Sequence, residues 1–132
     1  IFGYTILNDV SARDVQTAHK QWYFGKSLDG FTPIGPCIVT ADAFADYPPR
    51  LGIRSFVNGE KRQDSNTALQ IFDIDHVIAE LSQGMTLKAG TIIATGTPAG
   101  VGMGMDPPQF LKPGDVVRCE IDGIGTLTNP VK

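Results

Sequence analysis

The sequence has 132 residues, a length that fits one domain. Its composition, 42% hydrophobic and 19% charged, is typical of an ordinary soluble protein. The formal charge of −3 comes from 11 basic and 14 acidic residues, and the basic residues are scattered, which argues against nucleic acid or an anionic membrane as a partner. No apolar run reaches the roughly 20 residues that a membrane-spanning helix needs.

The first third of the chain predicts a strand, a short helix and a long loop. Residues 1–7 carry aromatic and β-branched side chains and predict a strand. Ser11 and Asp14 have the spacing of a capping box, which predicts a helix that ends near Lys20. Residues 21–36 contain several glycines and prolines and are interpreted as a long ordered loop.

The middle of the chain predicts a buried strand and then a hairpin. The apolar run at 36–40 predicts the strand, and the connector at 41–50 is blocked from regular structure by two consecutive prolines. The loosely alternating run at 51–57 is followed by Asn58 and Gly59, which both tolerate a positive φ angle. This is the clearest local signal in the sequence.

The second half predicts one amphipathic helix and further strands. Apolar residues recur every three or four positions over 73–83, and Gly84 follows, which predicts a helix closed by a glycine. The run T-I-I-A-T at 91–95 predicts a buried strand, and K-P-G-D at 112–115 predicts a turn.

A second hairpin is predicted around Asp122 and Gly123. Many short strands separated by glycine and proline turns favour a rolled or sandwiched sheet over a doubly wound α/β fold. The predicted fold class is therefore mainly β (α+β), a mixed β-roll or sandwich with a few short helices. We expect residues 1–132 to form one domain.

The cysteines and histidines give weak signals. Cys37 and Cys119 each lie in an apolar run, and we interpret them as reduced, buried thiols, with a disulfide or a metal pair as the alternatives. Without C-x-x-C spacing they favour a reducing compartment, and we expect a cytoplasmic protein. His76 is predicted on a helix surface and His19 near a helix end, and neither has an evident nucleophile beside it.

Asp9 is the first candidate for a functional residue, because it stands at the tip of the predicted first strand. A carboxylate there can cap a turn or bind a hard metal ion, and caps are commoner. Asp14 fits the capping box, and Arg13 could pair with either carboxylate. Gln16 lies one helical turn beyond, on the same side of the predicted helix.

Two loops offer further polar groups. Lys26 stands between Gly25 and Ser27 in a loop rich in aromatic residues, where a half-buried ammonium could hold a carboxylate or polarise a carbonyl oxygen. Gly96 and Thr97 lie in T-G-T-P-A-G-V-G, where glycine permits close backbone approach and threonine offers a hydroxyl and an N–H. The alternatives are a solvated lysine and a tight crossover between strands.

In order and spacing, these stretches resemble the C-terminal catalytic region of the fumarylacetoacetate hydrolase family. The resemblance covers nearly the whole chain. Within that family, the chain is most similar to the 5-carboxymethyl-2-hydroxymuconate and 2-hydroxyhepta-2,4-diene-1,7-dioate isomerases. The stretches that carry it are F-G-Y-T-I-L-N-D-V-S-A-R-D-V-Q, W-x-x-G-K-S-L-D-G-F-x-P-I-G-P, V-N-G-E-K-R-Q-D-S-N-T, T-L-K-A-G-T-I-I-A-T-G-T-P-A-G-V-G and F-L-K-P-G-D-V-V.

The resemblance implies a divalent-metal enzyme that acts on a 2-oxo or enol di-acid through a metal-stabilised enolate. The metal is Mg²⁺ or Mn²⁺, sometimes Ca²⁺, and Asp9 aligns with one of its ligands. Lys26 aligns with the catalytic and substrate-binding lysine, while Gln16, Gly96 and Thr97 align with substrate-binding positions. The implied reactions are C–C hydrolysis, decarboxylation or isomerisation in aromatic or small keto-acid catabolism. The resemblance also implies a small-molecule substrate and a homodimer.

The chain departs from the family pattern at its start. The family's Glu-x-Glu metal ligands and its His-Glu acid/base pair would lie before Ile1 and have no match here. One carboxylate cannot make a tight Mg²⁺ site. We therefore expect either a domain that lacks its N-terminal part and belongs to a larger enzyme, or an inactive 132-residue species. The competing hypothesis is a non-catalytic β-rich module that keeps the scaffold without a complete metal site.

Overall fold

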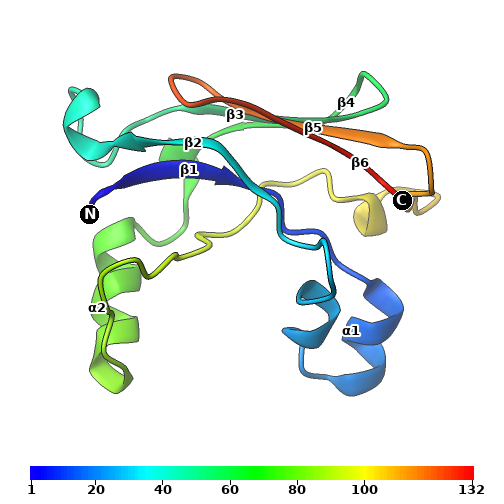
Figure 1. Ribbon diagram of the computed structural model, residues 1–132, viewed down its shortest axis with the longest axis horizontal. Coiled ribbons are helices and arrows are strands. Elements are labelled where there is room, and N and C mark those ends of the chain that lie inside the picture. The colour runs from blue at the N-terminus through cyan, green and yellow to red at the C-terminus, as the bar shows by residue number, and fades with distance from the viewer.

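Figure 1 shows the fold in a computed structural model that describes residues 1–132, with every side chain except that of His19. Two antiparallel sheets form its centre. The smaller sheet pairs β1 (Gly3–Leu7) with β2 (Ile34–Thr40), and their register shifts between Tyr4 and Ile6. The strand predicted at the start of the chain is confirmed.

The larger sheet has four strands in the order β4-β3-β5-β6, so that the two hairpins lie side by side. Strand β3 pairs with β4 on one side and with β5 on the other. The strands are β3 (Gly52–Val57), β4 (Glu60–Asn66), β5 (Val116–Ile121) and β6 (Gly125–Pro130).

Both predicted hairpins are confirmed, and their turns show why. Asn58 and Gly59 adopt φ angles of 51° and 84° between β3 and β4. Gly123 adopts a φ of 76° between β5 and β6. These left-handed conformations match the twist of the flanking strands and are accessible mainly to glycine and asparagine. The turn predicted at 112–115 is also present, with the amide of Asp115 bonded to the carbonyl of Lys112.

The two α-helices have different starts. Helix α2 (Ile74–Gly84) begins as predicted, with the Asp73 side chain accepting a hydrogen bond from the His76 amide at 2.7 Å. Helix α1 (Arg13–His19) has Ala12 at its N-cap and no side-chain cap. The predicted capping box is therefore wrong, because the Ser11 hydroxyl bonds the Asp9 carbonyl at 3.3 Å instead of capping the helix.

The strands lie in two layers with both α-helices on one side of them, at opposite ends (Figure 1). The small core lies where the layers meet: Ile6 of β1 is 2% exposed, and Val117 and Ile124 are 7% exposed. The layers approach closely, since a Cβ added to Gly35 would stand 3.6 Å from the Leu127 side chain. The predicted class, mainly β with a few short helices, is confirmed.

Two predictions about buried strands are wrong. Residues 91–95 form no strand, although their sequence is apolar and β-branched. The run at 36–40 belongs to β2 but is mostly exposed, with Ile38 57% exposed. An apolar run indicates burial only when another layer covers it, and in the described residues no layer covers these side chains.

Apolar surface is unusually extensive. The accessible surface is 9046 Å², whereas a monomer of 14.2 kDa is expected to expose about 6,800 Å². The total surface thus exceeds this expectation by about 2,200 Å², and large apolar side chains are exposed before β1, after α1 and before α2. The exposed residues include Phe2, Trp22, Tyr23, Ile71 and Phe72. No helix among the described residues is long and apolar enough to cross a membrane.

Candidate active site

An ion pair at the end of β1 forms the centre of the candidate site. The Lys26 ammonium contacts the Asp9 carboxylate directly, and Lys26 Nζ lies 3.1 Å from Ser11 Oγ. The side chains of Lys26 and Asp9 are 27% and 37% exposed. Within the described residues no backbone amide donates to the Asp9 carboxylate. Asp9 therefore does not cap a turn, and it faces the G-K-S loop.

The loop that carries Lys26 packs tightly against α1. The Ala12 amide donates to the Gly25 carbonyl at 2.8 Å. A Cβ added to the buried Gly25 would lie 2.9 Å from the Ala12 carbonyl oxygen and 3.0 Å from Gln16, so only glycine fits this approach. Thr32 Oγ1 donates to the Lys26 carbonyl at 2.8 Å and holds the far side of the loop.

Gln16 is buried beside this loop, with 5% of its surface exposed. Arg13 Nη1 donates to Gln16 Oε1 at 2.9 Å. Arg13 thus bonds an amide oxygen, and the described residues contain no ion pair between Arg13 and a carboxylate. Since a guanidinium only donates, the Gln16 oxygen must face it, and its amide nitrogen is left without a hydrogen-bond partner in the described chain. That nitrogen can donate to a ligand.

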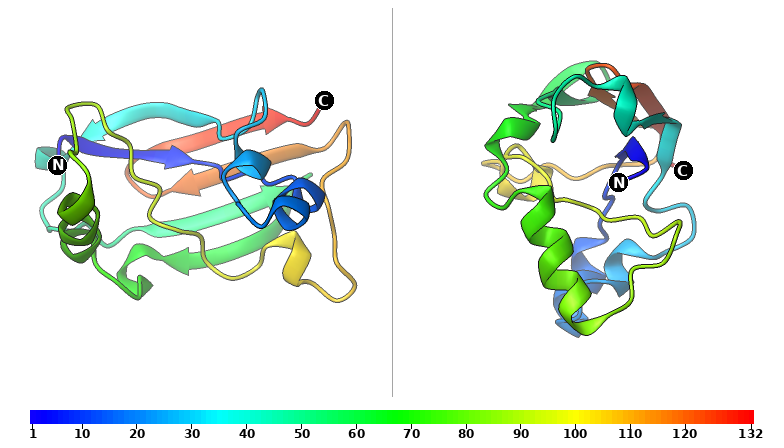
Figure 2. Two further views of the ribbon diagram at one scale, coloured as in Figure 1. Left: turned by 90° about the horizontal axis from the view of Figure 1, so that it is seen from below. Right: turned by 90° about the vertical axis from the view of Figure 1, so that its left-hand side faces the viewer.

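Gly96 and Thr97 lie on an exposed loop that crosses between the helices and the larger sheet (Figure 2). Gly96 has a φ of 105°, and an added Cβ there would meet no atom within 4 Å. Gln63 Nε2 of β4 donates to Thr97 Oγ1 at 2.9 Å. No hydrogen bond or ion pair in the described part of the chain joins Thr97 to Asp9 or Lys26, so these residues form two separate polar groups.

The side chains described do not complete a metal centre. They contain no group of three or more His, Cys, Asp or Glu side chains that could hold an ion. Asp9 offers an accessible carboxylate at the candidate site, and it suits a hard cation as a single oxygen ligand.

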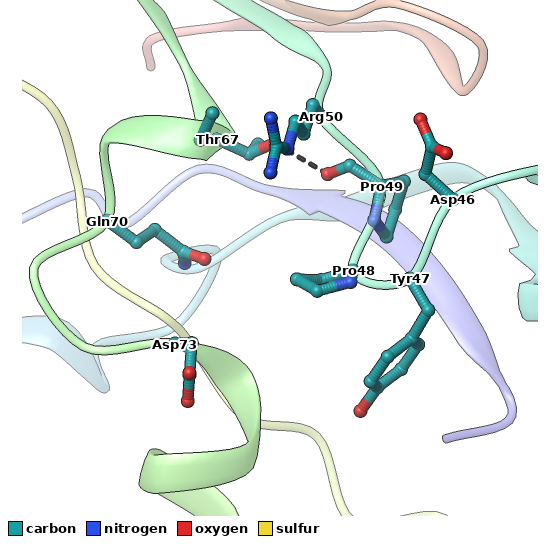
Figure 3. A pocket seen from close by; sticks show the side chains of 9 residues that line it. Asp46, Tyr47, Pro48, Pro49, Arg50, Thr67, Gln70 and Asp73 are labelled. Carbon is teal, nitrogen blue, oxygen red and sulfur yellow. Dashed lines mark hydrogen bonds between the residues drawn. The ribbon is translucent and has the colours of Figure 1, made fainter.

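A separate hollow of about 650 Å³ lies beside the connector between β2 and β3 (Figure 3). None of the five predicted site residues lines it. Next to it, the Tyr47 hydroxyl donates to the Asp75 carboxylate, and this hydrogen bond raises the pKa of Tyr47 to about 12. The residues that line the hollow are Asp46, Tyr47, Pro48, Pro49, Arg50, Thr67, Ala68, Gln70 and Asp73.

The cysteines and His76 lie outside the candidate site. Both thiols are free, as predicted; Cys37 is exposed rather than buried, and Cys119 is half-buried. Burial raises the pKa of the Cys119 thiol, which keeps it protonated and unreactive. His76 is exposed and stacks on Phe72 with 4.7 Å between ring centroids, in agreement with a surface position. The side chain of His19 lies outside the described part of the structure.

Sequence reasoning missed two polar residues that touch the predicted ones. Ser11 contacts the Lys26 ammonium, although its spacing to Asp14 suggested a helix cap. Gln63 holds Thr97 from a strand 34 positions earlier in the chain. Both contacts join residues that are distant in sequence. The only local signal for either residue was that a polar side chain stood inside one of the stretches that resemble the family.

The domain is a β-roll with a carboxylate–lysine pair at the end of one strand and a glycine-threonine loop on its larger sheet. These features define its class. The fumarylacetoacetate (FAA) hydrolase C-terminal family matches residues 1–132. The chain therefore belongs to the fumarylacetoacetate hydrolase family.

Relatives with three different activity names are similar to this chain. Oxaloacetate tautomerase YisK of Bacillus subtilis is 52% identical over 131 residues, which cover 99% of this chain and 43% of that protein. The fumarylacetoacetate hydrolase structure from Exiguobacterium antarcticum is 56% identical with a TM-score of 0.95, covering 99% of this chain and 47% of that one.

A third relative is the structure of 5-carboxymethyl-2-hydroxymuconate delta-isomerase from Mycobacterium smegmatis. It is 47% identical with a TM-score of 0.85, covering 98% of this chain and 48% of that one. The chain thus spans less than half the length of these relatives. All three are named as enzymes, but the reactions in their names differ.

Proposed function

We propose that the protein containing this chain is an enzyme that acts on a 2-oxo or enol di-acid through its enolate, with keto–enol or double-bond isomerisation as the reaction. The observation that carries the proposal is the Lys26 ammonium held against Asp9 and Ser11 at the end of β1. The tautomerase and isomerase relatives support isomerisation, while the fumarylacetoacetate hydrolase structure supports C–C hydrolysis through the same enolate as the alternative reaction. Aromatic or small keto-acid catabolism is the proposed setting.

Lys26 supplies positive charge where the substrate gains negative charge. An enolate forms when a proton leaves the carbon next to the carbonyl, and the carbonyl oxygen then carries the charge. A half-buried ammonium fixed by two partners stabilises that oxygen more than bulk water does, because it needs little reorganisation. Lys26 is therefore proposed as the catalytic and substrate-binding lysine.

Two neutral donors would bind the carboxylate groups of the substrate. Gln16 is held by Arg13 so that its side-chain N–H groups are free to donate. Gly96 and Thr97 offer a hydroxyl and an open backbone on an exposed loop. Hydrogen bonds to a charged carboxylate are roughly twice as strong as neutral ones, so such donors orient a di-acid without burying another charge.

Asp9 is proposed as one ligand of a divalent cation, Mg²⁺ or Mn²⁺, and in some conditions Ca²⁺. Its carboxylate is accessible and is bonded by no backbone amide in the described residues, which fits that role. When bound, such a cation polarises the carbonyl oxygen of a 2-oxo acid. The remaining ligands are proposed to come from the part of the protein that corresponds to the uncovered length of its relatives.

The extensive apolar surface supports two further proposals about assembly. Specific dimers commonly bury about 1,600 Å² in total, and the excess of about 2,200 Å² over a compact monomer is therefore large enough to cover such an interface. We propose that residues 1–132 form one part of a larger catalytic unit and that this unit is a homodimer. The free cysteines agree with a cytoplasmic location.

An enzyme assay on the intact protein tests the function. Enolic oxaloacetate is mixed with the protein and Mg²⁺, and its disappearance is followed by ultraviolet absorbance against the uncatalysed rate. The proposal expects faster ketonisation without release of CO₂ or of a cleaved acid. Release of CO₂ would replace isomerisation by decarboxylation, and no activity on any 2-oxo di-acid would contradict the proposal.

One observation favours the competing hypothesis of a non-catalytic module for the 132-residue chain alone. The side chains described hold no complete group of metal ligands. Titration of Mn²⁺ into this chain by itself and into the intact protein separates the hypotheses. Tight binding by the intact protein alone agrees with a domain that needs the rest of the protein, and no binding by either agrees with the module.

A further inference from the structure

The loop that carries Gly96 and Thr97 has few internal supports. Residues 92–100 make no backbone–backbone hydrogen bond in the described structure. The hydrogen bonds that do reach this stretch come from one side chain, Gln63 of β4, which donates to Thr97 Oγ1 at 2.9 Å and to the Pro98 carbonyl at 2.7 Å. Nearby, the backbone of Gly100 packs so closely on Arg62 that an added Cβ would meet its carbonyl oxygen at 2.1 Å.

We propose that Gln63 is a positioning residue that fixes the loop and sets the hydrogen-bonding state of Thr97, so that the Thr97 hydroxyl donates to an anionic oxygen of the ligand. This inference rests on the proposed function of Thr97 in binding a 2-oxo acid carboxylate. It adds a residue of strand β4, outside the predicted site, on which that binding depends.

The orientation of the Gln63 amide follows from its partners. A backbone carbonyl such as that of Pro98 can only accept, so the side chain must present its nitrogen to it. The same nitrogen then donates its second hydrogen to Thr97 Oγ1. The oxygen on the other side accepts from Ser55 Oγ at 2.8 Å, across the strand pair β3–β4. All three contacts are satisfied in one orientation.

This orientation decides what Thr97 can do. A hydroxyl has one hydrogen to donate and two lone pairs to accept. Because Gln63 occupies one lone pair, the Thr97 hydrogen is not used toward β4, and no other described residue accepts it. Thr97 is exposed, so its hydrogen is available to a carboxylate in front of the loop. The chain of hydrogen bonds Ser55–Gln63–Thr97, called the relay below, thus leaves the Thr97 hydroxyl free to donate to a ligand.

The relay also places Thr97 on a defined side of the larger sheet. Ser55 pairs with Gln63 on one side and with Cys119 on the other, and Cys119 pairs with Leu127. Leu127 faces Gly35 of β2. Thr97 is therefore held on the sheet face that looks toward the β1–β2 layer, and β1 leads directly into Asp9.

The test compares the intact wild-type protein with Gln63→Met, which keeps the length of the side chain but removes its donors. Cleavage by proteinase K within residues 95–100, measured without ligand under native conditions, should become at least about tenfold faster, since a lost hydrogen bond of about 1.4 kcal/mol raises the population of the opened loop by that factor. Cleavage within β5 should not change. Equal cleavage of the loop in both proteins would overturn the positioning role.

A double-mutant cycle tests the link to Thr97. Oxalate, a dianion with adjacent carboxylates, serves as the probe, and its Kd is measured by calorimetry with Mg²⁺ present. Gln63→Met should weaken binding about tenfold or more in the wild-type background, but less than about twofold in Thr97→Val, because the two residues act through one hydroxyl. Additive effects would overturn the proposal. Lys61→Met, on the same strand and exposed, serves as the control with unchanged binding.

The two arms separate this inference from the proposed function. If the wild-type protein binds no oxalate and turns over no 2-oxo acid, the proposed function fails, and proteolysis of the loop alone decides whether Gln63 positions it. If binding is present and the cycle is additive, the function stands and the inference falls.

Discussion

The Lys26 ammonium lies in direct contact with the Asp9 carboxylate, although 17 positions separate the two residues in the chain. The contact exists because Gly25 lets the lysine loop pack against the start of α1, immediately after the strand that ends near Asp9. A cation and an anion are thus presented together at one strand end. Such a pair suits a ligand that develops negative charge beside the ammonium and that binds together with a cation held by the carboxylate.

Lys26→Met in the intact protein tests whether this ion pair serves chemistry or stability. We expect kcat to fall by about 100- to 1,000-fold, which is the usual effect of removing one donor that stabilises a developing oxyanion. Stability should change little, because partly exposed ion pairs contribute only about 0–1 kcal/mol. Steady-state kinetics and urea unfolding measure the two effects.

The matched control for this variant is Lys61→Met, which removes the exposed ion pair between Lys61 and Asp64 on β4. It should leave both kcat and stability unchanged. An unchanged kcat in Lys26→Met would remove Lys26 from the mechanism, whereas equal losses of kcat in both variants would point to a general effect of charge.

Gly100 gives a prediction about stability with an internal control. Gly100 and Gly96 share a φ of 105°, but an added Cβ meets the Arg62 carbonyl oxygen only at Gly100, while Gly96 has open space. Gly96→Ala should cost about 1–2 kcal/mol of unfolding free energy from the backbone conformation alone. Gly100→Ala should cost about 1–3 kcal/mol more, from overpacking against a backbone atom. Equal losses in urea unfolding would contradict this packing.

The hydrogen bond between Tyr47 and Asp75 predicts a dependence of stability on alkaline pH. It raises the pKa of Tyr47 from 10.0 to about 12 in the folded protein. A raised pKa means that folding favours the protonated phenol, so the contribution is complete below pH 10 and is lost as the pH rises toward about 12. The stability difference between wild type and Tyr47→Phe should therefore shrink across this range.

Urea unfolding of both proteins at several pH values between about 9 and 12 measures that difference. Asp75→Ala, which removes the acceptor, should reproduce the behaviour of Tyr47→Phe. A difference that grows or stays constant as the pH rises would show that the phenol is not held protonated by this carboxylate.

Local signals predicted the parts of this fold that local chemistry determines. Asn58 and Gly59 fix a hairpin because both accept positive φ angles, and Asp73 starts α2 because its carboxylate reaches the His76 amide. The position of Asp9 at a strand end followed from the apolar run before it. These features depend on neighbours within a few residues.

Other features depended on partners that the sequence does not show. Residues 91–95 have strand propensity but pair with no strand, and the loop is held by Gln63 instead. Ser11 has the spacing of a cap, yet the competing contact with Lys26 decides its position. Arg13 likewise bonds Gln16 in place of the ion pair with a carboxylate that its position allowed. Each outcome was set by tertiary contacts that override local preference.

The role of Asp9 as a cation ligand is the claim on which the enzymatic account depends most. The most direct test titrates Mn²⁺ into the intact wild-type protein and into Asp9→Asn, which keeps the shape of the side chain and removes its charge. We predict one tight Mn²⁺ per chain in the wild type, with affinity lowered at least about 100-fold and turnover abolished in the variant, because Mn²⁺ prefers charged oxygen ligands. Unchanged Mn²⁺ affinity together with unchanged turnover in Asp9→Asn would contradict the account.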